Sequence, residues 1–293
     1  MSLVIYIRRI VMKTFKLNNG VEMPKIGIGT FLLEPKDAEN SVKFALENGY
    51  YLVDTANAYC NERAVGRGIK LSGMNREDVF VSTKLWPTEY ENEHAIDETL
   101  ERLGLDYIDL LFLHQPAGNW EKGYKMIEAA YKAGKVKSIG VSNFEGQYIE
   151  KLLTICEIKP QVIQVECHPF YPQTELRKIT DTENIRIMSW YPLGGKGMTA
   201  DLLDSQIVKD IAKKYGKSSA QVVLRWHVQM GFVTIPGSKN PEHIKANIDI
   251  FDFELSQEDM DNMGTLNIGK RRYTRTEKAL EDFAKWQPTF EKE

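Results

Sequence analysis

The sequence predicts an α/β protein of the (β/α)₈ barrel class (a TIM barrel), and three observations support this prediction. The polar residues Asp54, Lys84 and His114 recur 30 residues apart. Each closes a short apolar run, and the stretches between these runs have the spacing of apolar residues that is typical of helices. A strand, a helix and two loops take about 30 residues. The three residues should therefore lie at the carboxyl ends of successive parallel strands, where such barrels carry their functional groups.

The first expected element is a β-hairpin, which should cover the bottom of the barrel. From Lys13 the sequence alternates apolar and polar residues on either side of Asn19-Gly20, a dipeptide that suits a two-residue hairpin turn. Residues 1–12 carry an apolar run that is too short to span a bilayer, so we expect them to be an N-terminal appendage. No linker or low-complexity run divides residues 13–293, which should form a single domain.

Eight strands and the helices between them should follow the hairpin. Short runs rich in Val, Ile and Leu, without strict alternation, are typical of strands covered on both faces. We expect strands at residues 25–29, 51–54, 79–84, 108–114, 136–142, 162–166, 185–190 and 232–236. Apolar spacing predicts helices at residues 36–48, 61–71, 92–103, 124–133, 146–156, 174–180, 204–215 and 218–230, with a final helix from about Ser256 and further C-terminal helices or loop.

An open, doubly wound sheet is the alternative arrangement of these elements. That fold commonly has a GxGxxG turn between its first strand and first helix. Here Gly27-Ile28-Gly29 lacks the third glycine and leads into no immediate helix. The sequence therefore favours right-handed crossovers that close the strands into a barrel.

Composition and charge indicate a globular protein and argue against several classes of partner and site. A hydrophobic fraction of 42% with 27% charged residues is ordinary for a soluble globular protein. A net charge of -3 argues against a nucleic-acid partner, and no segment indicates a membrane partner. The cysteines Cys60, Cys156 and Cys167 are too few for a disulfide framework, so we expect a cytoplasmic protein. Cys167-His168 lacks further ligands at suitable spacing, and we predict no metal site.

Four residues are candidates for catalysis: Asp54, Tyr59, Lys84 and His114. Each alone has a structural explanation, but packing does not require all four at one rim. A tyrosine hydroxyl has a pKa of about 10, so it is a poor acid at neutral pH unless a cation such as Lys84 favours its phenolate. Asp54 would hold that lysine charged and in place. His114 could orient a carbonyl oxygen, and the group could then protonate an alkoxide as it forms.

The segment GYYLVDTANAY at residues 49–59, followed by NERAVG, resembles the first signature of the aldo-keto reductases. Further segments that resemble this family extend from the hairpin to Asn247. Within the family, the chain most resembles the bacterial 2,5-diketogluconate reductase and glyoxal reductase-like members. This resemblance implies a catalytic tetrad of Asp54, Tyr59, Lys84 and His114. One departure is Tyr51, where the family usually has arginine. It starts its strand away from the reactive rim, so we expect little effect on the chemistry.

The resemblance also implies a nicotinamide coenzyme. GVSNF at residues 140–144, IQVECHP at 163–169 and SWYPLG at 189–194 resemble the strands that bind the nicotinamide. Ser142, Asn143 and Gln164 would bind the carboxamide. Trp190 would stack under the ring, with a core tryptophan as the alternative. Leu193 and Gly194 would approach the pyrophosphate, and IPGSKNPEHIKAN at 235–247 would place four residues at the adenosine end: Ser238, Lys239, His243 and Asn247.

Three departures in the last motif bear on the choice of coenzyme. The family commonly has lysine at Gly237, arginine at His243 and glutamate at Ala246. Charge-assisted contacts contribute roughly 1.5 to 3 kcal/mol each, so the loss of two cations should weaken the preference for the 2′-phosphate of NADPH. We therefore expect NADPH as coenzyme, with a relaxed or dual preference that admits NADH.

Aromatic residues near the rim indicate a pocket for a small carbonyl compound. The candidates are Phe31, Trp86 and Trp120, with Trp286 and Phe290 from the tail. The loop after His114 is short, at residues 115–119, which suggests an open mouth and broad substrate tolerance. The family's tendency implies a monomer.

Two other functions compete with carbonyl reduction. A barrel aldolase would use Lys84 as a Schiff-base nucleophile, although pairing with Asp54 argues against the lowered pKa that this requires. A barrel that binds the coenzyme without catalysis is the second alternative, and no interaction segment supports it.

Overall fold

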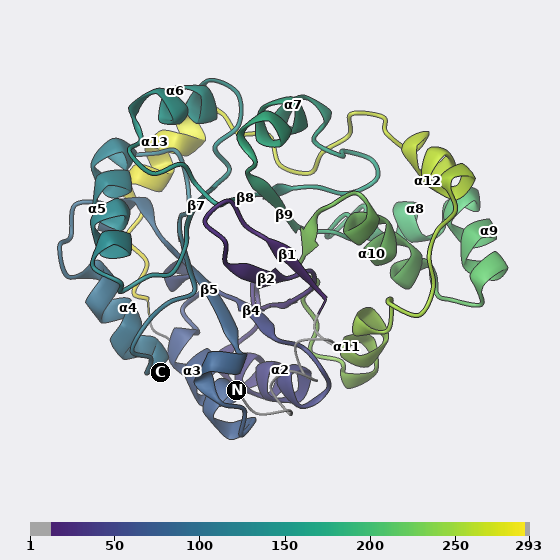
Figure 1. Ribbon diagram of the computed structural model, residues 1–293, viewed down its shortest axis with the longest axis horizontal. Coiled ribbons are helices and arrows are strands. Elements are labelled where there is room, and N and C mark those ends of the chain that lie inside the picture. Colours follow the sequence, from purple (N-terminus) through teal and green to yellow (C-terminus); the bar gives the residue numbers. More distant parts are fainter. Residues whose placement is uncertain (1–12, 291–293) are drawn as a thin grey trace.

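A computed structural model describes residues 13–290 as an eight-stranded parallel sheet surrounded by helices (Figure 1). Each strand is hydrogen-bonded to the next, and a parallel bridge between Ile26 and Thr234 joins the first strand to the last. The predicted (β/α)₈ barrel is confirmed, and every strand overlaps its expected range. The strands are β3 (Ile28–Gly29), β4 (Leu52–Asp54), β5 (Phe80–Leu85), β6 (Leu110–Leu113), β7 (Ile139–Ser142), β8 (Val162–Glu166), β9 (Arg186–Trp190) and β10 (Val233–Thr234). The appendage expected at residues 1–12 lies outside the described residues.

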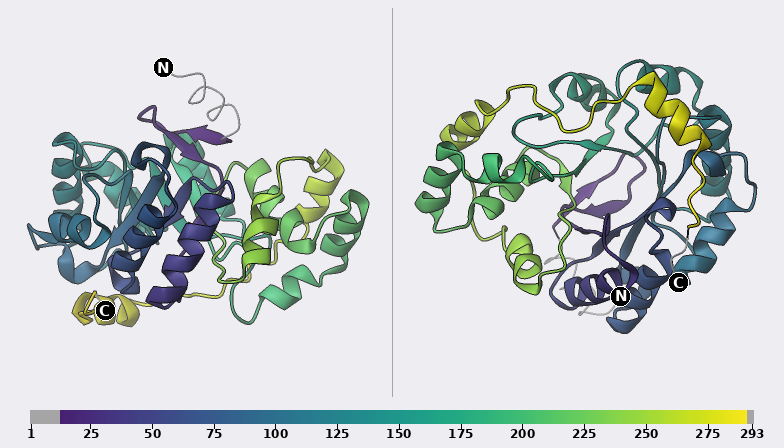
Figure 2. Two further views of the ribbon diagram at one scale, coloured as in Figure 1. Left: turned by 90° about the horizontal axis from the view of Figure 1, so that it is seen from below. Right: turned by 180° about the vertical axis from the view of Figure 1, so that it is seen from behind.

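The N-terminal hairpin closes the bottom of the barrel, as predicted. Its strands are β1 (Thr14–Lys16) and β2 (Glu22–Pro24). The side-chain amide of Asn18 donates to the carbonyl oxygen of Pro160 at 3.1 Å, just before β8. Leu17 and Met23 pack in one cluster with residues that fill the barrel. In Figure 2, left, the purple hairpin lies at the opposite end of the molecule from the yellow C-terminal helix.

The hairpin turn differs from the expected two-residue turn. The N–H of Leu17 bonds the carbonyl oxygen of Val21 at 2.9 Å, which leaves three residues in the turn. The last of these, Gly20, has a φ of 87°. Three-residue turns of this kind end in a left-handed residue, and glycine adopts that conformation without steric penalty.

Helices lie between the strands and beyond the last strand. They are α2 (Pro35–Glu47), α3 (Glu62–Leu71), α4 (Ala95–Leu103), α5 (Trp120–Lys132), α6 (Gln147–Ile155), α7 (Thr174–Glu183), α8 (Thr199–Leu203), α9 (Gln206–Tyr215), α10 (Ser219–Gln229), α11 (Pro241–Ile248), α12 (Gln257–Gly264) and α13 (Glu277–Lys285). Ser218 and Ser256 cap α10 and α12, each in a reciprocal capping box. Within residues 13–290, none of the helices has both the length and the apolar character needed to cross a membrane.

Side chains alternate along β5 between the barrel interior and the surrounding helices. Thr83 faces outward, where its hydroxyl donates to the Glu62 carboxylate at 2.6 Å, and this carboxylate also pairs with Arg102 at 2.7 Å. Its neighbours Ser82 and Lys84 therefore face inward. This alternation, set by the strand itself, brings polar groups to the carboxyl-terminal end of the barrel.

A glycine on β7 makes room for the apolar layer below these polar groups. A Cβ at Gly140 would lie 2.6 Å from the ring of Phe112 on the neighbouring strand β6. Phe112 is fully buried and packs with Leu52, Leu110 and other residues of the barrel interior. These side chains fill the interior below the rim, and the space for a ligand lies at the carboxyl-terminal end.

Candidate active site

The structure brings the four candidate catalytic residues together at the carboxyl ends of β4, β5 and β6. The ammonium Nζ of Lys84 lies 2.7 Å from Oδ2 of Asp54, and both side chains are buried. Tyr59 ends the short 3₁₀ helix η1 (Asn57–Tyr59) that follows β4, and its ring centroid is 4.9 Å from Nζ of Lys84. The rings of Tyr59 and His114 lie 5.7 Å apart. The 30-residue spacing in the sequence therefore corresponds to one cluster in space.

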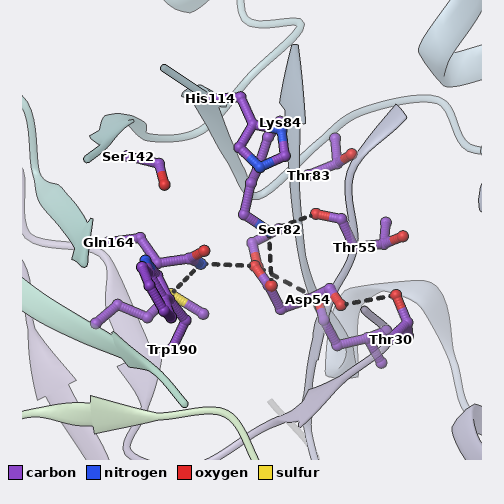
Figure 3. A network of polar contacts seen from close by, with 12 residues as sticks. Thr30, Asp54, Thr55, Ser82, Thr83, Lys84, His114, Ser142, Gln164 and Trp190 are labelled. Carbon is purple, nitrogen blue, oxygen red and sulfur yellow. Dashed lines mark hydrogen bonds and ion pairs between the residues drawn. The ribbon is translucent and has the colours of Figure 1, made fainter. Parts of the chain in front are cut away.

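Asp54 is the centre of a hydrogen-bond network (Figure 3). Besides its ion pair with Lys84, the carboxylate accepts a hydrogen bond from the Ser82 hydroxyl at 2.7 Å and one from the Gln164 amide at 2.9 Å. The Lys84 ammonium also donates to the backbone carbonyl of Thr55 at 2.7 Å. These contacts fix the orientation of both charged groups. They also connect Gln164, a predicted coenzyme residue, to the cluster of candidate catalytic residues.

The pKa of Tyr59 differs in direction from the sequence-based expectation. Burial raises this pKa well above the ordinary value of a tyrosine, and the Asp54 carboxylate raises it further. We expected Lys84 to lower it. Burial disfavours the phenolate more than the Lys84 charge favours it, so desolvation prevails. Burial and the Asp54 carboxylate therefore favour the protonated, neutral form of Tyr59.

Lys84 and His114 are also shifted by burial. Desolvation lowers the pKa of Lys84, and the Asp54 carboxylate opposes that shift. Burial and the Lys84 charge lower the pKa of His114 well below its usual value, so the imidazole is neutral near pH 7. Its Nδ1 has no hydrogen-bond partner among residues 13–290. Nδ1 is buried, but His114 also lines the cavity described below, and a neutral imidazole there is suited to a hydrogen bond with a ligand.

A cavity of about 820 Å³ opens above this cluster. Its walls include three of the catalytic candidates, six residues predicted to bind coenzyme and three predicted pocket aromatics. These are Asp54, Tyr59, His114, Ser142, Asn143, Gln164, Trp190, Leu193, Ser238, Phe31, Trp86 and Trp286. Lys84 lies beneath the cavity rather than on its wall, where it is fully buried. The volume and the mixture of apolar walls with convergent polar groups fit an organic coenzyme and a small substrate.

Hydrogen bonds hold one wall of the cavity in place. The indole Nε1 of Trp190 donates to Oδ1 of Asn143 at 3.1 Å. The Asn143 amide in turn lies 3.2 Å from the Ser142 hydroxyl and 3.3 Å from the backbone carbonyl of His114. Because Trp190 lines the cavity and is only partly buried, the alternative of a core tryptophan is not supported.

Only one of the four residues predicted to bind the adenosine end of the coenzyme lies on the cavity wall. Ser238 lines the cavity, but Lys239, His243 and Asn247 do not. Lys239 pairs with Asp37 at 3.1 Å. Asn247 is buried on α11, and His243 is exposed on the same helix. Gly194, which was predicted to approach the pyrophosphate, lies in the loop after β9 and does not line the cavity.

Gly237 has a local reason to be a glycine. A Cβ at this position would lie 2.9 Å from the carbonyl oxygen of Gly29, closer than real Cβ atoms approach. A larger residue would therefore require a shift of the backbone after β10. In this structure the chain passes the end of β3 too closely for a side chain at residue 237 without such a shift.

Two predicted pocket aromatics lie elsewhere. Trp120 begins α5 and packs in the hydrophobic core, edge-on to Phe144 with ring centroids 5.3 Å apart. The prediction that Trp120 lines the pocket is therefore wrong. Phe290 packs under the Arg102 guanidinium at 5.4 Å and does not line the cavity either.

The tail covers the side of the cavity that lies next to the short loop after His114, where an open mouth was expected. The indole Nε1 of Trp86 donates to the carbonyl oxygens of Phe283 and Trp286, at 3.1 and 3.0 Å. A Cβ on Gly118, in the short loop after β6, would lie 3.7 Å from the methyl carbon of Ala284 on α13. The short loop thus leaves room for α13 rather than an opening.

Sequence reasoning missed several residues of the cavity wall. They are Tyr191, Lys196, Arg272, Tyr273 and Phe283. Two signals could have indicated them, namely the glycine run LGGKG at residues 193–197 and the basic run KRRYTR at 270–275. Neither run has a periodic pattern that fixes its position in space.

A closed parallel barrel with a buried acid–base cluster and one large cavity at its carboxyl-terminal rim defines a barrel enzyme. The model of the Aldo/keto reductase family matches residues 25–268, and the chain belongs to this family of oxidoreductases. It is similar to glyoxal reductase of Bacillus subtilis, with 47% identity over 88% of this chain and 94% of the relative. Methylglyoxal reductase DkgA of Escherichia coli is 37% identical over 87% and 94% of the two chains.

The fold likeness extends to solved structures. An aldo-keto reductase enzyme from a Medee basin deep-sea metagenome library superposes with a TM-score of 0.87 and 42% identity. The match covers 90% of this chain and 98% of that chain. The family model ends at residue 268, so α13 and the segment before it lie outside the matched region.

Proposed function

We propose that this protein reduces small aldehydes and ketones to alcohols with NAD(P)H, and that Tyr59 donates the proton. The observation that carries the proposal is the position of Tyr59. Its ring lies on the cavity wall, with its centroid 4.9 Å from the Lys84 ammonium and 5.7 Å from the centroid of the neutral His114 imidazole. A proton donor, a cation and a hydrogen-bond donor thus surround the place where a carbonyl oxygen would gain negative charge.

Each residue of the cluster has a distinct role in this proposal. His114 donates a hydrogen bond that orients the substrate oxygen. Tyr59 gives its proton to that oxygen as negative charge develops there. Lys84, held by Asp54 and the Thr55 carbonyl, stabilises the phenolate that remains. The raised pKa of Tyr59 keeps its proton in place until that moment.

The coenzyme would occupy the remaining wall and supply the hydride. Ser142, Asn143 and Gln164 would bind the carboxamide, and Trp190 would face the nicotinamide ring. Leu193 and Gly194 would approach the pyrophosphate. The adenosine end would meet Ser238, Lys239, His243 and Asn247.

Substitution of Tyr59 by Phe tests the assignment of the acid. General acid catalysis contributes about 10² to 10⁴ in rate, so we expect Tyr59→Phe to lower kcat for carbonyl reduction by that factor. Binding of NADPH, followed by quenching of tryptophan fluorescence, should remain close to the wild-type affinity. If the variant keeps most of its activity, another group supplies the proton.

The coenzyme preference follows from the absence of cations at two positions. Gly237 carries no charge and His243 is exposed on α11. We propose a relaxed preference in which NADH also supports turnover. Measurement of kcat/KM with NADPH and with NADH on a panel of aldehydes and ketones tests this coenzyme preference. A value for NADH at least a thousandfold below that for NADPH would contradict the proposal.

The names of the relatives narrow the first substrates to assay. Glyoxal reductase and methylglyoxal reductase DkgA are among the similar proteins. We propose short dicarbonyl compounds of this kind as substrates, alongside larger aldehydes that fit the aromatic cavity. The cytoplasmic location and the monomeric state expected from the sequence remain predictions.

The aldolase alternative is not supported by the position of Lys84. Its ammonium is fully buried, bonded to Asp54 and Thr55, and absent from the cavity wall. A nucleophilic lysine must reach the substrate carbon. Borohydride treatment in the presence of a carbonyl substrate should therefore leave Lys84 unmodified.

A further inference from the structure

One buried asparagine joins the rim of the cavity to the candidate catalytic residues. Asn61 is 2% exposed and directly precedes α3, in the N-cap position. An asparagine at an N-cap commonly accepts a hydrogen bond from the first turn of its helix. Within residues 13–290, the Asn61 side chain makes no such bond. Helix capping therefore does not explain the contacts of this side chain.

The amide nitrogen of Asn61 holds a turn between β3 and α2, residues 30–33, which we call the rim turn. Nδ2 of Asn61 donates to the backbone carbonyl oxygens of Thr30 and Leu33, both at 3.0 Å. The Leu33 N–H also donates to the Thr30 carbonyl at 3.1 Å, which closes the turn. Because carbonyl oxygens only accept hydrogen bonds, these partners fix the orientation of the Asn61 amide.

The rim turn needs this support because its backbone is strained. Leu32 has a φ of 62°, in the left-handed region that a leucine rarely adopts. Such a conformation persists only where surrounding contacts impose it. The turn places Phe31 and Leu32 on the wall of the cavity, and the ring centroids of Phe31 and Tyr59 lie 5.0 Å apart. The conformation of the turn thus sets the position of a ring that packs beside the proposed proton donor.

The other end of the Asn61 side chain is bonded to the loop that holds Lys84. Oδ1 of Asn61 accepts a hydrogen bond from the Thr55 hydroxyl at 3.0 Å, and the Thr55 carbonyl accepts one from the Lys84 ammonium at 2.7 Å. A second connection runs from the Thr30 hydroxyl to the backbone carbonyl of Asp54 at 3.1 Å (Figure 3). One buried side chain therefore contacts both the rim turn and the support of the catalytic cation.

We propose that Asn61 is a positioning residue for carbonyl reduction, which holds the rim turn so that Phe31 packs against Tyr59. The proposal rests on the proposed function, since it assumes that Tyr59 supplies the proton. Asn61 does not line the cavity in the described part of the chain, so it acts through Phe31 rather than by contact with substrate. Without its two donated hydrogen bonds the strained turn relaxes, and the phenol loses a contact that sets its orientation.

Two variants of Asn61 separate positioning from helix capping. Serine and aspartate are about as favourable as asparagine at an N-cap, so neither change should weaken α3. Asn61→Ser removes the contacts of the amide without adding a charge. Asn61→Asp keeps an acceptor for the Thr55 hydroxyl, but an ionised carboxylate cannot donate to the rim turn. With benzaldehyde and NADPH, both variants should lower kcat/KM roughly tenfold.

A double-mutant cycle with Phe31→Ala tests whether Asn61 acts through the rim turn. If Asn61 acts by placing the Phe31 ring, its loss matters only while that ring is present. Asn61→Ser should therefore lower kcat/KM by less than about twofold in the Phe31→Ala background. Hydrogen exchange followed by mass spectrometry should also become faster at residues 30–33 in Asn61→Ser, because the turn opens more often.

Ser218→Ala provides the matched control. Ser218 caps α10 in a reciprocal capping box and does not line the cavity. Loss of this cap should lower stability but leave kcat/KM unchanged. Thermal melting followed by circular dichroism compares the stability of all variants.

Three results with an active wild-type protein would overturn this inference alone. Wild-type kcat/KM in both Asn61 variants would exclude a positioning role. An equal loss in the presence and absence of the Phe31 ring would show that Asn61 does not act through the rim turn, and an equal loss in Ser218→Ala would indicate general destabilisation. If the wild type reduces no aldehyde with NADPH or NADH, the proposed function fails and this inference fails with it.

Discussion

At the scale of single residues, the ion pair between Lys84 and Asp54 orders the site more than it stabilises the fold. Removing two charges from water carries a large desolvation penalty, which the attraction between them repays only when further hydrogen bonds are present. Asp54 has those bonds from Ser82 and Gln164, and Lys84 has one to Thr55. The result is a cation in a fixed position beneath the Tyr59 ring.

A double-mutant cycle on this pair should separate stability from activity. Lys84→Met leaves the Asp54 carboxylate buried without its partner, which should reduce the free energy of unfolding by about 3 to 5 kcal/mol. The double variant Asp54→Asn/Lys84→Met should regain a large part of that loss but no activity, because the cation is still missing. Urea denaturation and carbonyl reduction measure the two effects. Equal destabilisation of the single and double variants would show that the unpaired carboxylate is not its cause.

At the scale of elements, the sequence predicted what depends on local periodicity. Asp54, Lys84 and His114 could be placed because each ends an apolar strand, and parallel strands bring their carboxyl ends to one rim. Helix α10 could be placed because Ser218 and its apolar spacing are local signals. Helix α13 could not, because its position depends on Trp86, which is almost 200 residues earlier in the chain and donates to Phe283 and Trp286.

The sequence also could not show whether an aromatic side chain near the rim faces the cavity or the hydrophobic core. Trp120 and Trp86 both follow strands near the rim, but only Trp86 points to the cavity. Trp120 sits in the first turn of α5, where its ring turns into the core against Phe144. Arg272 was missed for a similar reason, since a cation in an irregular tail has no pattern that places it. Long-range contacts decide both cases.

The tail element leads to a prediction about substrate size. Trp286 packs edge-on to Trp86 with ring centroids 4.9 Å apart and lines the cavity. Contacts between aromatic rings contribute about 0.5 to 1.5 kcal/mol beyond burial. Trp286→Ala should therefore raise KM for an aromatic aldehyde by roughly two- to tenfold. KM for methylglyoxal should change little, because that compound is too small to reach the tail.

Trp286→Phe is the control for this prediction. It keeps an aromatic ring against Trp86 and should retain most of the affinity for the aromatic aldehyde. Equal changes in KM for the aromatic aldehyde and for methylglyoxal in Trp286→Ala would indicate a general disturbance of the site rather than a contact with the substrate.

At the scale of the whole molecule, stability is coupled to pH through buried histidines. His227 on α10 is fully buried. Its ring nitrogens lie 2.8 Å from the carbonyl oxygen of Val223 and 3.1 Å from that of Cys167, at the end of β8. Burial lowers the pKa of His227 to about 4, despite the two carbonyls that favour a proton, and nearby His168 lowers it further. In its neutral form His227 has one N–H and donates to only one of these two carbonyl oxygens, so burial, rather than its hydrogen bonds, decides its charge.

The sign of the pH effect follows from this lowered pKa. Below about pH 6.5 the histidine of the unfolded chain takes up a proton that the folded chain excludes until about pH 4. The free energy of unfolding should therefore fall as the pH decreases through this window, by about 3 kcal/mol from His227 alone. His114, whose pKa is also lowered by burial, acts in the same direction. Urea denaturation at several pH values between 7 and 4 should show a smaller slope for His227→Gln than for wild type, while the exposed His94→Gln keeps the wild-type slope. If His227→Gln keeps the full slope, other groups account for the acid sensitivity.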